Sequence, residues 1–138
     1  MREQPLVPVR SIADSLGIFG SALCALHCAL VPSLLVAGFA LPTALLSDEL
    51  FHRLALIVVV PVALLALTLG CRRHRNRGVL LLGILGLGGI IGSSVLPHAW
   101  LGETWERVAM LAGSLLLIAA HLRNVRLCRR GGCVEQPG

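Results

Sequence analysis

The chain has 138 residues, of which 56% are hydrophobic and only 14% are charged, with a formal net charge of +5 and a mean hydropathy of +0.84. This length fits one domain, and the hydropathy excludes an ordinary soluble globular protein. Charged residues avoid four long tracts, each near the length that spans a bilayer once interfacial residues are counted. We therefore predict an all-α integral membrane protein with four antiparallel transmembrane helices.

The basic residues show how these helices are oriented. All twelve are arginines, and ten lie in the N-terminal segment, the loop between the second and third tracts, and the C-terminal segment. Only Arg53 and Arg107 fall in the other two loops. Because cytoplasmic loops carry an excess of basic residues, this asymmetry predicts that both termini are cytoplasmic. The basic charge is thus explained by topology, and no nucleic-acid partner is expected.

The tracts also divide the chain. We expect a cytoplasmic tail over residues 1–13, a four-helix transmembrane domain over 14–127, and a cysteine-containing cytoplasmic tail over 128–138. Asp14 or Ser15 is suited to cap the first helix, because either side chain can accept a hydrogen bond from an early backbone N–H. The predicted helices span about residues 16–39, 54–70, 79–96 and 105–122.

The first predicted helix carries a cluster of metal-ligand types. Cys24 and Cys28 are four residues apart, so a helix places both on one face with their Cβ atoms about 5–6 Å apart. His27 lies beside them, and Gly17, Gly20 and Ser21 share the same arc. Thiols and imidazole are soft to borderline metal ligands. The alternative is that both cysteines are simply small buried apolar residues.

The third helix is rich in glycine, and the pairs Gly88/Gly92 and Gly89/Ser93 fit the spacing at which small residues let membrane helices approach closely. These pairs also permit a homo-oligomer. The tract is not a phosphate-binding loop, because it lacks the Lys-Ser/Thr ending and a preceding strand.

Three residues near the predicted cytoplasmic end are further candidates. His121 lies at the end of the fourth tract, where an ionisable side chain either has a function or reaches the headgroups and the last carbonyls. Cys128 and Cys133 flank two glycines, so both sulfurs could wrap one ion, or they are ordinary cytosolic thiols. We expect the cores of the four helices to contain no Asp or Glu that could relay protons. We also expect no enzyme activity, because the sequence offers no recognisable pair of nucleophile and base.

The sequence resembles the MerC family of inner-membrane mercury-uptake proteins. The resemblance rests on Asp14, Gly17, the segment from Gly20 through Cys24 and His27 to Cys28, and Pro32, followed by the glycine-rich third helix. His121-Leu122-Arg123-Asn124 and the cysteine pair in the tail extend it to about Cys133.

The resemblance implies a multi-pass protein of the bacterial inner membrane that transports mercuric ion and has no resident cofactor. The ion would be taken by Cys24 and Cys28, with His27 beside them, and passed by thiolate exchange toward the cytoplasm. The inner ligands would be Cys128 and Cys133, with His121 lining the exit. Cytosolic thiols or a mercuric reductase would receive the ion.

Two alternatives stay open. The protein could handle another soft or borderline ion, Cu(I) or Zn(II), with His27 and His121 as ligands. It could also be a membrane scaffold whose glycine and cysteine faces only pack helices.

Overall fold

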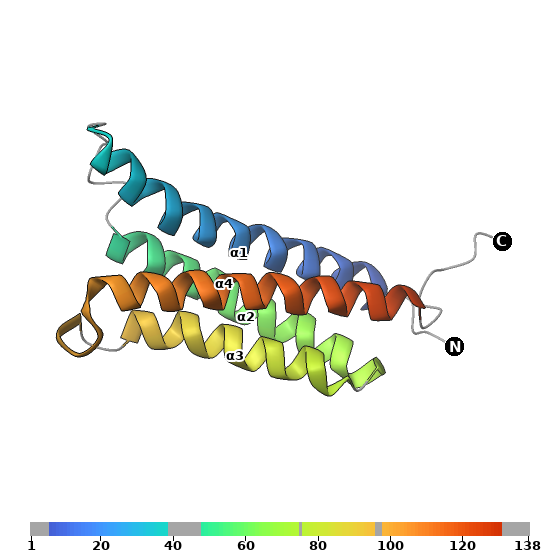
Figure 1. Ribbon diagram of the computed structural model, residues 1–138. Coiled ribbons are helices and arrows are strands. Elements are labelled where there is room, and N and C mark those ends of the chain that lie inside the picture. Colours follow the sequence, from blue (N-terminus) through green and yellow to red (C-terminus); the bar gives the residue numbers. More distant parts are fainter. Residues whose placement is uncertain (1–5, 39–47, 75, 96–97, 131–138) are drawn as a thin grey trace.

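The computed structural model describes residues 6–38, 48–74, 76–95 and 98–130, which form four α-helices and no strand (Figure 1). The helices are α1 (Leu6–Val36), α2 (Asp48–His74), α3 (Arg77–Val95) and α4 (His98–Arg130). Each contains a span of at least 18 residues that is apolar enough to cross a membrane. These spans confirm the prediction of an all-helical protein with four membrane-crossing helices.

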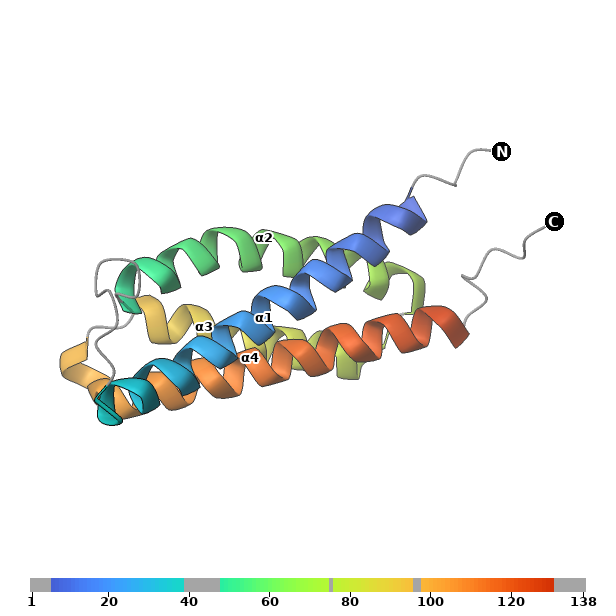
Figure 2. The ribbon, with the colours of Figure 1, turned by 90° about the horizontal axis from the view of Figure 1, so that it is seen from above.

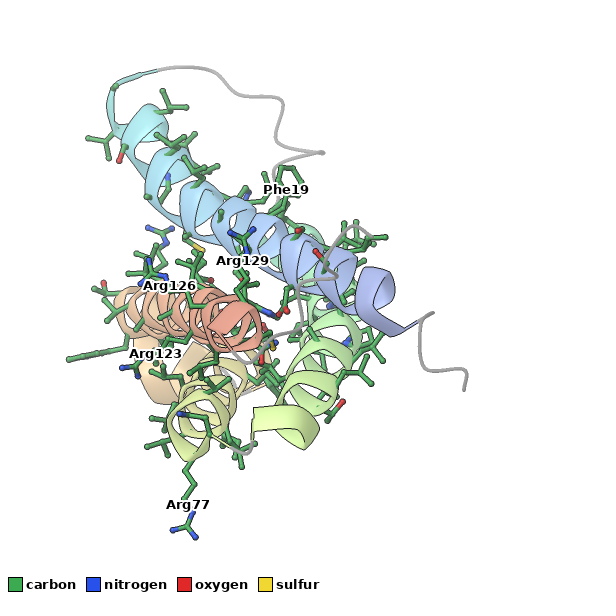
Figure 3. All side chains as sticks on the ribbon, turned by 90° about the vertical axis from the view of Figure 1, so that its right-hand side faces the viewer. Phe19, Arg77, Arg123, Arg126 and Arg129 are labelled. Carbon is green, nitrogen blue, oxygen red and sulfur yellow. The ribbon has the colours of Figure 1, made fainter. Side chains whose placement is uncertain are left out.

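The faces of α1 show how the sequence suits a bilayer. Large apolar side chains at spacings of three and four residues point away from the bundle, among them Leu16, Phe19 and Leu23 (Figure 3 labels Phe19). Small and polar residues at the same spacing form the opposite, buried face. A water-soluble helix has the reverse arrangement. The exposed apolar face is therefore suited to contact lipid.

α1 packs against α2 and α4, whereas α3 packs against the same two helices from the other side. Viewed from above, α1 crosses obliquely between α2 and α4, with α3 behind them (Figure 2). This arrangement turns the small-residue face of α1 toward α2 and α4. The interior of the bundle at α1 is thus built by three helices.

α3 and α4 approach each other at glycines. A Cβ added to Gly86 would lie 3.0 Å from the carbonyl oxygen of Gly113, and one added to Gly89 would lie 3.2 Å from Cα of Gly113. The predicted close contact at Gly89 is therefore present. Gly88 and Gly92 differ from the prediction, because an added Cβ at either would meet nothing within 4 Å. Their face points away from the described neighbouring helices.

Several predicted boundaries were wrong. α1 begins at Leu6, so residues 6–13 are helical and Asp14 lies inside the helix, where it cannot be the cap. α1 ends at Val36, before the predicted residue 39. An uncharged tract marks only the apolar part of a helix. Because backbone hydrogen bonds continue into the polar residues on either side, α1 starts earlier than the uncharged tract.

α2 and α4 are also longer than predicted. α2 extends from Asp48 to His74, and α4 extends to Arg130, so Cys128 belongs to the last helix and not to a tail. Within α4, Gly102 has φ of 70°, a left-handed conformation that separates the first turn from the long helix. The predicted start near residue 105 therefore lies close to the start of that long segment.

Exposed arginines gather at one end of the bundle. Arg77 starts α3, and Arg123, Arg126 and Arg129 lie on the last turns of α4 (Figure 3). The start of α1 lies at this same end (Figure 1). The charge asymmetry of the sequence thus becomes a polar, basic end of an otherwise apolar bundle.

Candidate functional site

The predicted ligands of the first helix lie inside the bundle. Cys24, His27 and Cys28, which we call the thiol turn, are 2%, 8% and 5% exposed. Both cysteines belong to the apolar core, together with Val59 and Ala63 of α2. The helical spacing of four residues, combined with burial of both positions, places the two thiols on one interior face of α1. The thiols are therefore shielded from solvent and from lipid.

His27 occupies a different part of the interior. Its ring stacks on Phe51 of α2, with centroids 3.8 Å apart and planes inclined by 12°. Among the residues that the structure describes, no group of three or more His, Cys, Asp and Glu side chains is arranged to hold a metal ion. The thiol turn therefore brings together two buried thiols and an imidazole that stacks on an aromatic ring.

A second group of polar side chains lies at the contact of α1, α2 and α4. Nδ1 of His121 is 2.8 Å from Oδ1 of Asp14, and Nδ2 of Asn124 donates to both oxygens of the same carboxylate at 3.0 and 2.9 Å. Nδ2 of Asn124 also lies 3.3 Å from the carbonyl oxygen of Ala66 in α2. We call Asp14, His121 and Asn124 the polar cluster. The carboxylate of Asp14 links α1 to α4, and the amide of Asn124 links α4 to α2.

Two glycines make room for this polar cluster. A Cβ at Gly17 of α1 would collide with the ring of His121, and a Cβ at Gly70 of α2 would collide with the amide of Asn124. Both glycines are buried inside helices. A glycine in a helix interior costs about 1 kcal/mol relative to alanine. Here the missing side chains give two large polar groups direct access to the neighbouring backbones.

Two polar atoms near this contact have no hydrogen-bond partner among the described residues, namely Nε2 of His121 and Oγ of Ser21. Both side chains are fully buried.

Cys128 continues the interior face of α4. It follows His121 by seven residues, or two helical turns, and is 3% exposed. Its place in a helix differs from the predicted cytoplasmic tail, in which Cys128 and Cys133 lie together. Cys133 lies outside the described residues, so the proposed pairing of these two thiols stays a prediction.

Asp14 is a further candidate residue, although its place at the edge of an apolar tract is typical of a helix cap. It lies within the apolar span Ser11–Val36 and is 1% exposed, so the expectation of no acidic residue within the helical cores was wrong. The spacing would have revealed it. Asp14, Gly17, Ser21, Cys24 and Cys28 follow steps of three, four, three and four residues, which define one helical face.

Comparison with known proteins gives one match. The sequence model of the MerC mercury resistance protein family matches residues 14–126. The matched range begins at the buried aspartate of α1 and ends just beyond the polar cluster in α4. Neither the curated proteins nor the solved structures include a match to the chain.

Proposed function

Because the chain belongs to the MerC family, we propose that it transports mercuric ion across the bacterial inner membrane, with four antiparallel helices and both termini in the cytoplasm. The observation that carries this proposal is the pair of buried thiols, Cys24 and Cys28, one turn apart on the interior face of a membrane-spanning helix. A pair of thiols is the donor set that a very soft cation prefers.

Charge supports the same pair. A bare divalent ion is very costly to bury in an apolar interior. Bound by two thiolates, Hg(II) forms a formally neutral unit that an apolar core can hold. The neighbouring core residues Val59 and Ala63 are uncharged, so they would not alter the neutrality of this unit. Cys24 and Cys28 are thus the proposed ligands.

The number of ligands favours mercury over zinc. Zinc sites in proteins use three or four protein ligands, whereas Hg(II) accepts two thiolates in a nearly linear arrangement. Among the described residues, no group of three or more metal-binding side chains is arranged for an ion. His27 stacks on Phe51 through its ring face, and His121 lies 2.8 Å from Asp14. The two thiolates are the proposed ligands of mercury, with His27 beside them.

Delivery to the cytoplasm would proceed by ligand exchange. Cys128 is a buried thiol near the basic end of the bundle, on the cytoplasmic side in the proposed orientation. An incoming thiolate attacks the bound ion and displaces one of its sulfur ligands, as in thiol–disulfide exchange. Cytosolic thiols or a mercuric reductase would take the ion onward from there.

Metal binding by the purified protein tests this proposal. The full chain in detergent, with Cys71, Cys128 and Cys133 replaced by serine, is titrated with HgCl2 and studied by X-ray absorption. We expect one ion per chain with two sulfur neighbours. The matched control adds Cys28→Ser and should show at most one sulfur neighbour with weaker binding. Equal binding by this control would overturn the assignment of the pair.

A further inference from the structure

The basic end of the bundle carries exposed arginines far from most acidic residues of the described helices. Arg77 of α3 and Arg123, Arg126 and Arg129 of α4 are exposed. The acidic residues of these helices other than Asp14 lie toward the opposite end, where α2 and α4 start (Figure 1), namely Asp48, Glu49, Glu103 and Glu106. Asp14 is itself buried in the polar cluster. An anion that neutralises the basic end therefore has to come from outside the described helices.

Arg123 brings its charge from α4 to the start of α3. Its Nη1 is 3.7 Å from the point where a Cβ of Gly78 would lie, and Gly78 directly follows Arg77. Figure 3 views this end of the bundle and shows Arg77 and Arg123 extending outward. The positive end of the α3 dipole adds to the charge of the two side chains. The start of α3 is therefore a positively charged surface formed by two helices.

The exposed faces of the same two helices lead from apolar residues to these arginines. On α3, Leu81 and Ile84 follow Arg77 by four and seven residues, and both are 59% exposed. On α4, Arg126 follows the exposed Leu122 by four residues. Residues four apart on a helix share one face. Each helix thus presents an apolar surface that ends in a guanidinium group, which complements a molecule with apolar chains and an anionic head.

We propose that this end of the bundle binds an anionic phospholipid, with Arg77, Arg123 and Arg126 contacting its headgroup and the exposed faces of α3 and α4 contacting its acyl chains. A guanidinium group pairs with a phosphate through two parallel charge-assisted hydrogen bonds. Basic pockets between transmembrane helices are typical sites for such headgroups. A zwitterionic lipid binds less tightly, because its own ammonium group offsets the charge of its phosphate. The inference does not depend on which ion the thiol turn binds.

Native mass spectrometry of the full chain in a neutral detergent tests this binding. The protein is titrated with phosphatidylglycerol and, separately, with phosphatidylcholine that has the same acyl chains, so that the two lipids differ only in the headgroup. An arginine near an anionic membrane surface strengthens binding about fivefold, so we expect the parent protein to prefer phosphatidylglycerol by at least about 25-fold and Arg77→Gln/Arg123→Gln to lose about that factor. Arg126→Gln alone should lose about fivefold.

Arg53→Gln/Arg107→Gln is the matched control, because it also removes two positive charges but leaves the basic end intact. It should keep the preference of the parent protein. Unchanged circular dichroism and unchanged affinity for phosphatidylcholine would show that the losses in the other variants come from the headgroup contacts. Equal affinity of the parent protein for both lipids, or an equal loss in the control, would overturn the inference. Displacement of phosphatidylglycerol by an equal concentration of glycerol phosphate would assign the arginines to a soluble anion and would also overturn it.

Discussion

Replacing Gly17 with alanine is the most direct structural test of the polar cluster. The added Cβ would occupy the position of the His121 ring, so the ring must move away and lose its hydrogen bond to Asp14. A hydrogen bond to a charged group contributes about 1.5–3 kcal/mol. Alanine also improves the helix propensity of α1 by about 1 kcal/mol relative to glycine. The expected net loss in the free energy of unfolding is about 0.5–2 kcal/mol.

Gly88 offers a matched control in the same protein. It is also a glycine inside a membrane helix, but an added Cβ would meet nothing within 4 Å. Gly88→Ala should therefore raise the free energy of unfolding by up to about 1 kcal/mol. Unfolding of both variants by sodium dodecyl sulfate in mixed micelles, followed by circular dichroism, measures the difference. If Gly17→Ala is stabilised as much as Gly88→Ala, the packing of His121 on α1 is wrong.

Three other predictions concern neighbouring contacts. Gly70→Ala should lower the free energy of unfolding by about 1–3 kcal/mol, because its Cβ would collide with the amide of Asn124; an unchanged unfolding curve would contradict this contact. Gly113→Ala should be destabilising by a similar amount, about 1–3 kcal/mol, since its Cβ would lie 2.8 Å from a carbonyl oxygen of α3 that cannot rotate away, and the same unfolding assay would show it. In single-cysteine proteins, Cys128 should react with a maleimide much more slowly than the exposed position in Arg129→Cys; equal labelling rates would show that Cys128 is accessible.

The sequence predicted the four helices because bilayer length and the absence of charge are strong signals. Helical spacing also places Cys24 and Cys28 on one face with small neighbours, which is visible without coordinates. In the structure this face is buried. These features depend on local periodicity along a single helix.

The polar cluster could not be predicted in the same way. Asp14 and His121 are 107 residues apart in sequence, so their hydrogen bond depends on how α1 and α4 pack. A charged residue at the edge of an apolar tract is typical of a helix cap or an interfacial side chain. The position of Asp14 along the chain therefore does not indicate that its side chain is buried between helices. Cys128 was misplaced for the same reason, because the arginines around it indicate an aqueous tail, whereas the helix continues and buries this one face.

Uptake by cells tests most directly whether the buried thiol pair carries mercury across the membrane. Cells that express the chain are compared with cells that express the Cys24→Ser/Cys28→Ser variant at equal membrane levels, using radioactive Hg(II). We predict that the chain raises uptake above that of empty cells and that the double variant loses the whole increase. Uptake by the variant equal to that of the parent chain would contradict the claim.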